Sequence, residues 1–247
     1  MNKTFCKKSN LINFLLAGCL ILFNLIFVLT SCGLDTYYVI EPPYVNRETS
    51  YSSIEESENY FEFQTREDQD SGIKFLGTEV YYKIYDSTSK LSSEYTSINS
   101  AASSETSANQ SASRLIETYK FQPLRSSDNP GATILVPVTG TGKNRTVRIR
   151  LSNYFDYIAE FTVDKTRKGV PVRSIPKNPT FSFKEEMISG QLPKGGENAD
   201  ADYGYSTTEA VDAYYVSLFA VSVAQDSTYA WLYSNVVALG SVKISLE

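Results

Sequence analysis

The feature that most constrains the fold is an alternation of apolar and polar side chains with a period of two residues. In residues 60–67, Phe61, Phe63 and Thr65 occupy one set of alternate positions, and charged or amide side chains occupy the other. Similar segments recur at residues 78–86, 132–138, 145–152, 157–164, 180–185, 212–223 and 234–245. Glycine, proline, asparagine and aspartate between them mark turns. The pattern predicts an all-β fold, an antiparallel β-sandwich or a barrel, and we expect the sandwich.

One region, residues 87–119, departs from this alternation and is rich in serine and alanine. Apolar side chains fall there at helical spacing, namely Leu91, Tyr95, Ile98 and Ala102, and then Ala112, Leu115, Ile116 and Tyr119. We expect a helix, a break near residues 103–109 and a second short helix, forming an insertion packed on one edge of the sandwich. Because serine is a modest helix former and the apolar stripe is thin, a partly disordered loop is the alternative.

The first 31 residues have the layout of a secretory signal. Lys3, Lys7 and Lys8 lie in a start that contains no acid, and an apolar run follows from residue 11 to residue 29. A positively charged start before an apolar stretch is typical of signal peptides. The run is also long enough to cross a bilayer, so an uncleaved N-terminal anchor is the alternative.

Cys32 directly follows this leader, and the other two cysteines lie within it. Residues 29–32, Leu-Thr-Ser-Cys, resemble the lipobox of bacterial lipoproteins, in the looser form found in spirochaetes. The resemblance implies cleavage before Cys32, a diacylglyceryl group on its thiol, and acylation, for example with palmitate, of the new amino group. Two or more acyl chains make a stable membrane anchor, whereas one gives only marginal binding.

These features together predict the domain organisation. Residues 1–31 are the lipoprotein signal peptide, residues 32–57 a lipidated N-terminus, tether and first strand, and residues 58–247 the β-sandwich domain with its helical insertion at about 87–119. The first short strand is expected near residues 37–40, before Pro42 and Pro43, which favour extended backbone. The expected location is the cell envelope, with the chain lipid-anchored to a bacterial membrane and the outer membrane favoured.

Two absences narrow the possible chemistry. The chain has no histidine, which excludes Ser-His-Asp triads, Cys-His dyads and ordinary zinc sites. No cysteine follows Cys32, so the body cannot form an internal disulfide and its fold must rest on a hydrophobic core. Without the three lysines of the leader, 20 of the 23 basic side chains remain against 28 acidic ones. That balance argues against a nucleic-acid partner, whose binding rests on phosphate neutralisation.

Residues 213–239 carry a second resemblance, to the last hairpin of fibronectin type III domains. The matching positions are Tyr214 or Tyr215, Val216, Leu218 and Ala220 on the first strand, and Ser234, Asn235, Val237 and Leu239 on the second. Residues 77–87 resemble a central strand of that family. The resemblance implies a sandwich of the immunoglobulin or fibronectin III kind. The chain departs from the family in its helical insertion and in the position of its only tryptophan, Trp231, within the last hairpin.

Two loops raise the question of ligand binding. Residues 140–144 end in Gly-Lys-Asn, but they lack the residues of a phosphate-binding loop and predict a hairpin turn instead. Farther on, Asn198, Asp200, Asp202 and Glu209 have the spacing of calcium-loop ligands. The glycine of that motif is replaced by tyrosine, so we favour a solvated acidic loop and keep a loose calcium site as the alternative.

Two further patterns suggest binding surfaces. Residues 143–177 contain nine basic and three acidic side chains, with Arg148 and Arg150 on one face of a strand. We favour a solvated sheet face there, and a patch for lipid headgroups or an anionic glycan is the alternative. The pairs Tyr81-Tyr82 and residues 214–215 each place one ring on either side of a strand, so we expect one ring of each pair in the core and one on the surface.

The sequence therefore predicts a membrane-anchored envelope lipoprotein with a binding or structural role and no catalytic activity. Its expected partners are membrane lipid, reached through acylated Cys32, and an envelope protein, a glycan or a host molecule. We expect no cofactor and no metal. The alternative is a glycan hydrolase of the envelope that uses two converging carboxylates and needs no histidine.

Overall fold

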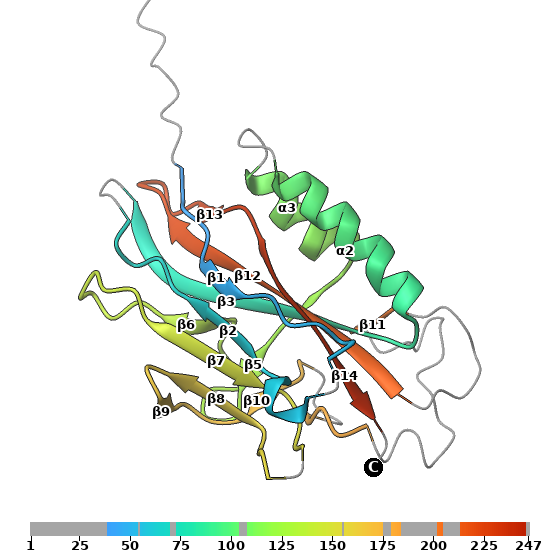
Figure 1. Ribbon diagram of the computed structural model, residues 1–247. Helices are drawn as coiled ribbons and strands as arrows, with labels where there is room; N and C mark the ends of the chain where they lie inside the picture. The colour runs from blue at the N-terminus through green and yellow to red at the C-terminus, as the bar shows by residue number, and fades with distance from the viewer. Residues whose placement is uncertain are drawn as a thin grey trace, which may run out of the picture. The chain divides into compact units, whose positions relative to one another are not determined.

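The computed structural model describes residues 39–53, 55–69, 73–103, 108–154, 156–174, 179–183, 202–204 and 213–245. Residues 39–247 form one compact unit, which we call the body. Its described part is an all-β sandwich of mostly antiparallel strands with a small helical insertion, as the alternation predicted (Figure 1).

The smaller sheet of the sandwich is antiparallel throughout. Its strands, in spatial order, are β1 (Tyr44–Arg47), β2 (Phe61–Gln64), β7 (Thr146–Arg150), β8 (Glu160–Val163) and β9 (Thr166–Arg167). Their side chains alternate, so that the apolar positions Phe61, Phe63, Val147 and Ile149 are fully buried while the polar positions between them face outward. This is the alternation that a sheet with one face in the core requires.

The larger sheet is built on two long strands, β3 (Lys74–Tyr85) and β12 (Ala213–Gln225), which pair antiparallel along nearly their whole length. Short strands line their outer edges. Those on β3 are β6 (Ile134–Pro137), β4 (Gln122–Pro123) and the parallel β11 (Tyr203–Gly204), and those on β12 are β13 (Trp231–Tyr233) and β14 (Val237–Ser245). A separate small pair is formed by β5 (Arg125–Ser126) and β10 (Pro171–Val172).

The main core fills the space between the two sheets. It joins the inward side chains of β2, β7 and β8 to those of β3, β12 and β14, and Phe181 and Phe183 complete it. Gly240 marks a point where the two sheets meet, because Thr49 forms an isolated bridge to it. A Cβ at Gly240 would lie 1.9 Å from the Thr49 carbonyl oxygen, and the glycine has φ +100, so no other residue fits there without strain.

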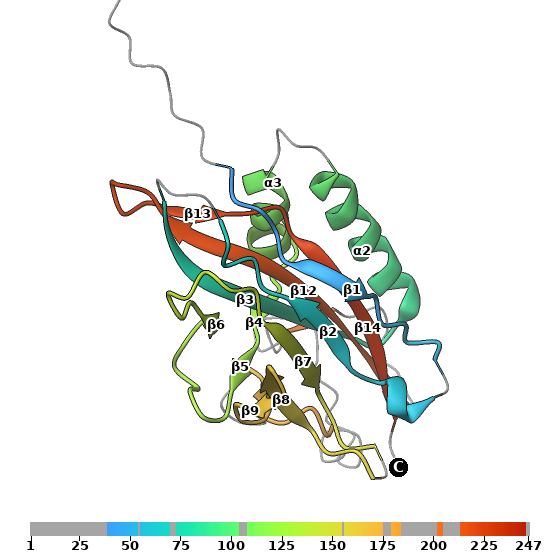
Figure 2. The same cartoon turned by 60° about the vertical axis from the view of Figure 1, so that its left-hand side comes forward.

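The helical insertion covers the outer face of the larger sheet (Figure 2). It consists of α2 (Thr88–Ala102), α3 (Ala108–Ser113) and the π-helix η3 (Arg114–Thr118); a short 3-10 helix, η1 (Glu56–Glu58), lies elsewhere. All eight apolar positions of the expected stripe lie in a second core beneath the helices, with Leu91, Ile98, Ala112 and Leu115 buried. The insertion is confirmed, but it packs on a face of the sandwich rather than on an edge, because β12 and β3 present apolar side chains on both faces.

That cover changes the outcome for the tyrosine pairs. Tyr82 and Tyr214 point into the main core, as expected, but Tyr81 is buried and Tyr215 partly buried under the helices. The expectation that one ring of each pair lies on the surface was wrong for Tyr81, whereas Tyr215 keeps part of its surface exposed.

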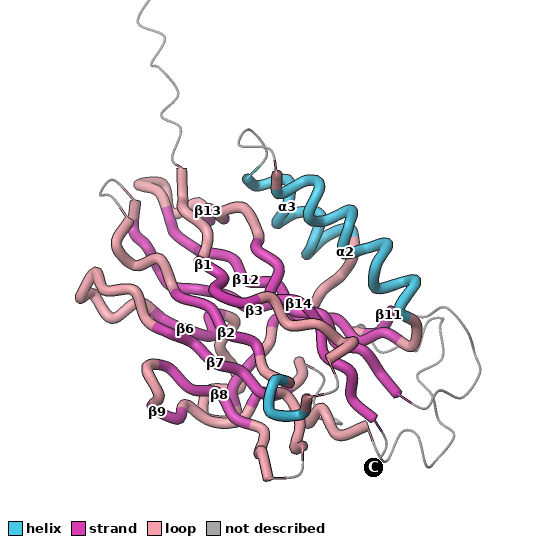
Figure 3. The backbone as a smooth tube through the Cα atoms, in the orientation of Figure 1, coloured by secondary structure: helices cyan, strands magenta, loops and turns pink. Residues whose placement is uncertain are grey.

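Three other local predictions were wrong (Figure 3). The first strand is β1, which begins directly after Pro42-Pro43 rather than before them; residues 39–40 are not strand, and residues 37–38 lie outside the described part. Residues 179–183 form no strand, although Phe181 and Phe183 are buried. Residues 140–144 are not a hairpin turn, since they join β6 in the larger sheet to β7 in the smaller one.

Candidate functional site

The predicted anchor residue, Cys32, lies outside the described residues, as does the whole motif around it. In the body, the described residues form no helix that is both long and apolar enough to span a membrane. Nor does the described part of the chain gather three or more cysteine, aspartate or glutamate side chains into a cluster that could hold a metal ion.

Of the four residues with calcium-loop spacing, only Asp202 is described, and it does not lie on a solvated loop. Its side chain is fully buried, and its two oxygens accept hydrogen bonds from Arg173 Nε at 2.9 Å and Arg173 Nη2 at 3.0 Å. Tyr82 donates a third, at 2.8 Å. The carboxylate is thus fully engaged in the interior, and the backbone carbonyl of Asp202 accepts a hydrogen bond from the Ile84 N–H at 2.8 Å, which holds the start of β11 against β3. Asn198, Asp200 and Glu209 lie outside the described residues.

The candidate binding site is a groove on the outer face of the smaller sheet. It has a volume of about 470 Å³, and its walls come from β2, β7, β8 and the β8–β9 turn. Its lining side chains are all polar or charged: Glu62, Thr146, Arg148, Glu160, Thr162, Asp164 and Lys165. The first five of these occupy outward positions of the alternation, whereas Asp164 and Lys165 lie on the β8–β9 turn. No other described element covers this face as the helices cover the larger sheet.

Strand register places Arg148 at the centre of this groove. Arg148 lies opposite Glu62 on β2 and opposite Thr162 on β8. It donates two hydrogen bonds to one oxygen of Glu62, at 2.7 and 3.0 Å. Both side chains remain partly exposed, so the pair lies in water rather than in the core.

Aromatic rings stack on Arg148, which lines the groove, and on Arg150, the next outward residue of β7, which is buried. The Arg148 guanidinium carbon is 4.3 Å from the centroid of the Tyr60 ring, and that of Arg150 is 4.6 Å from the centroid of the Tyr157 ring. Cation–π contacts of this kind hold the guanidinium planes in place. Burial under these rings lowers the pKa of Arg150, and its guanidinium also donates to the Ser57 carbonyl at 3.3 Å.

One end of the groove is fixed by the turn after β8. Asp164 and Lys165 both adopt positive φ, 49 and 63, as in the tight turns that match the twist of a hairpin. Asp164 then accepts the backbone N–H of Thr146 through its side chain at 2.9 Å, and its own N–H donates to the Thr146 carbonyl at 2.8 Å. These bonds hold the β8–β9 turn to the start of β7.

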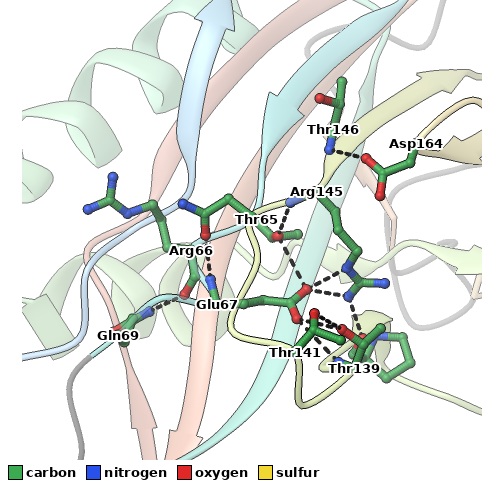
Figure 4. Close-up of polar contacts among 11 residues, drawn as sticks. Thr65, Arg66, Glu67, Gln69, Thr139, Thr141, Arg145, Thr146 and Asp164 are labelled. Atoms are coloured by element: carbon green, nitrogen blue, oxygen red, sulfur yellow. Dashed lines mark hydrogen bonds and ion pairs between the residues drawn. The ribbon is translucent and has the colours of Figure 1, made fainter.

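A buried ion pair supports the same end from the other side (Figure 4). Glu67 is almost fully buried and accepts hydrogen bonds from Arg145, including one from Nε at 2.5 Å. Its other oxygen accepts from the backbone N–H and the hydroxyl of Thr139, both at 3.2 Å. The pair therefore ties the connection between β6 and β7 to the segment after β2, next to Thr146.

The groove does not carry the positive field that the basic segment suggested. Four of the arginines counted there are engaged: Arg145 with Glu67, Arg148 with Glu62, Arg173 with Asp202, and Arg150 under two tyrosine rings. The groove itself contains three carboxylates and two cationic groups. The charges of the groove itself are therefore nearly balanced, and a headgroup or anionic-glycan patch elsewhere on this segment stays a prediction.

Sequence reasoning missed this site, because its members come from three separate segments and none carries a motif. The usable signal was the outward half of the alternation in residues 60–67, 145–152 and 157–164, where charged and hydroxyl side chains replace apolar ones. Assembling them required the pairing of β2 and β8 on either side of β7.

Neither a protein-family model, nor a curated protein, nor a solved structure matches this chain.

Proposed function

We propose that this chain is a lipid-anchored protein of the bacterial cell envelope that binds a polar, nearly neutral ligand, a glycan, in the groove of the smaller sheet. The anchor is acylated Cys32, the favoured membrane is the outer membrane, and the role is binding rather than catalysis. The observation that carries the binding role is the groove itself, whose lining alternates hydrogen-bond donors and acceptors.

The chemistry of the groove favours a polyhydroxylated ligand over an anion. Sugar hydroxyls both donate and accept hydrogen bonds, so they match a surface where the Glu62 and Glu160 carboxylates accept, Arg148 donates, and the Thr146 and Thr162 hydroxyls do both. Ordered partners such as these bind without large rearrangement, because Arg148 is already held by Glu62 and by the Tyr60 ring. The Tyr157 ring, 42% exposed, does not line the groove but stacks on Arg150, the next outward residue of β7 after Arg148, and its exposed part offers an apolar contact for a sugar that extends beyond the groove.

The binding proposal is tested by screening the full chain against an array of neutral and acidic oligosaccharides, followed by titration calorimetry with any sugar retained. We expect neutral or zwitterionic glycans to bind, and Arg148→Met to weaken binding at least tenfold. Lys243→Ala, an exposed cation on β14 outside the groove, is the matched control and should bind like the parent. Equal binding by Arg148→Met and the parent would overturn the site.

The anchor is tested separately in cells. We expect an alkynyl fatty acid to label the parent chain and not Cys32→Ala, and the variant to leave the membrane fraction if its leader is removed. Lipid label on Cys32→Ala would contradict the assignment. Protease treatment of intact cells then tells a surface-facing body from a periplasmic one.

A second candidate, a carboxylate-dependent glycan hydrolase, is favoured by one observation: Glu62 and Glu160 line the same groove from β2 and β8. Neighbouring strands lie about 4.8 Å apart, so these residues are about 10 Å apart across β7 at the backbone, with a further offset along the strands. Only side chains that lean toward each other would reach the roughly 5–10 Å that such chemistry uses. Release of reducing sugar by the parent, abolished in Glu160→Gln without loss of binding, would establish hydrolysis over binding alone.

A further inference from the structure

The connection between β12 and β13 presents two large aromatic side chains to solvent. Tyr229 is 74% exposed and Trp231 is 49% exposed. They are close in sequence on one tight turn, away from both cores. A single exposed apolar residue needs no explanation, but two adjacent large rings on one projection indicate a contact surface.

The turn that carries them is rigid. Asp226 Oδ1 accepts hydrogen bonds from the Thr228 N–H and hydroxyl, both at 2.7 Å, and from the Ala230 N–H at 3.0 Å. These bonds lower the pKa of Asp226, so the carboxylate stays ionised. Tyr229 has φ 65, a left-handed conformation that is unfavourable for a bulky aromatic residue. Strained backbone conformations are concentrated at functional sites, so the exposed ring of Tyr229 indicates a surface that contacts another molecule.

The position of this turn in the body suggests what it contacts. Figures 1 and 2 both place the β12–β13 connection at the end of the body where the described chain begins, ahead of β1. Val39, the first described residue, is itself 83% exposed. Seven residues lead from Cys32 to Val39, and that length of chain spans at most about 25 Å when extended. An anchor on Cys32 thus keeps this end of the body close to the bilayer.

We propose that Tyr229 and Trp231 insert into the interfacial layer of the membrane that holds Cys32, as a second point of attachment. This inference rests on the proposed lipid anchor. Tyrosine and tryptophan suit that layer because each joins an apolar ring to a polar tip. A tether alone leaves the body free to rotate, whereas a tether and an inserted turn together fix which face of the sandwich points away from the bilayer.

The chain contains a single tryptophan, so Trp231 reports directly on this contact. The experiment uses the mature acylated chain that begins at Cys32, reconstituted into phosphatidylethanolamine–phosphatidylglycerol vesicles and recovered by flotation. We expect the Trp231 emission to shift to shorter wavelength relative to the same protein without vesicles. Acrylamide quenching should fall at least twofold, and brominated lipids should quench the emission.

Two variants sharpen the result. Tyr229→Asn retains the left-handed backbone that asparagine tolerates, removes the second ring, and should reduce the shift and the lipid quenching. Ile158→Ser removes an equally exposed apolar side chain from the β7–β8 connection, at the opposite end of the body, and should change neither (Figure 1).

The outcomes separate the two proposals. If acrylamide quenches Trp231 equally in the vesicle-bound and the free protein, the proposed insertion is wrong, but the proposed anchor is not affected. A chain that does not float with the vesicles overturns the anchor and the inference that depends on it. Emission that shifts with protein concentration, but not with lipid, assigns the turn to a second copy and also overturns the inference.

Discussion

Strand β3 of the larger sheet and strand β7 of the smaller sheet both carry polar or charged side chains on their outward rows, yet most of those side chains end in opposite environments. On the larger sheet, the outward row of β3 runs through Glu79, Tyr81, Lys83 and Tyr85, and all four are buried beneath or beside the helical insertion. On the smaller sheet, the outward row of β7 runs through Thr146, Arg148 and Arg150. Thr146 and Arg148 remain in contact with water and line the groove, whereas Arg150 is buried against two tyrosine rings.

Polar groups beneath the helices all need hydrogen-bond or ionic partners, whereas polar groups on the open sheet can be solvated by water. Beneath the helices, Lys83 donates to Glu94 at 2.8 Å and to the Tyr119 carbonyl at 2.7 Å, and Tyr85 donates to the same Glu94 oxygen at 2.9 Å. On the open sheet, Arg148 meets Glu62 with similar distances but with solvent around it. Buried charges are strongly destabilising when a partner is lost, whereas exposed pairs contribute little.

The largest effect is expected from breaking the covered pair. Glu94→Leu leaves Lys83 charged and unpaired under the helices, so it should lower the free energy of unfolding by about 3–5 kcal/mol. Urea denaturation followed by circular dichroism measures the change. The double variant Lys83→Met/Glu94→Leu removes both charges and should recover most of the loss; a double variant as unstable as the single one would show that the pair's charges are not the cause.

Removing packing from the cover comes next. Leu115→Ala deletes a fully buried side chain of η3 that packs against the larger sheet, and we expect a loss of about 2–5 kcal/mol. The matched exposed change, Ile158→Ser, should stay within about 0.5 kcal/mol. If the two variants unfold at the same urea concentration, the helices do not stabilise the sandwich through this contact.

A smaller, pH-dependent effect is expected from Glu79. Burial raises the pKa of this carboxyl above its usual 4.5, so the folded state favours the protonated form. The stabilisation that follows from this raised pKa is complete when the pH is below the pKa of the unfolded chain. It is lost as the pH rises through the pKa of the folded protein. The parent should therefore lose more thermal stability between pH 4.5 and pH 7.5 than Glu79→Gln, which does not titrate. If the melting temperatures of both proteins declined equally, the pKa of Glu79 would not be raised in the folded state.

The smallest stability effect belongs to the open sheet. Glu62→Gln weakens an exposed pair and should cost less than about 1 kcal/mol. The same change should reduce glycan binding, because it alters an acceptor in the groove and releases Arg148. A large loss of stability would mean that the pair is structural, and the distinction between the covered and open faces would then fail.

Much of the strand content was predictable from local sequence. The alternation marked β2, β3, β6, β7, β8, β12 and β14, and the helical spacing marked the insertion. The short strands β1, β4, β5, β9, β10, β11 and β13 were missed as separate elements, since two to four residues carry too little periodicity. The candidate groove was not predictable at all, because Glu62 and Glu160 meet only through the strand order β2-β7-β8.

The sequence by itself determined the class of fold: short alternating strands, one helical insertion, and a body without cysteine or histidine that depends on its core. Tertiary structure alone decided which polar positions remained in water. An alternating pattern states that neighbouring side chains point to opposite faces, but it does not state what packs on either face. The helices bury the outward row of β3. Asp202, predicted to lie on a solvated loop, is instead buried and paired with Arg173. Both outcomes depend on contacts between segments far apart in the chain, and a charge is stable in the interior only where such a contact supplies its partner.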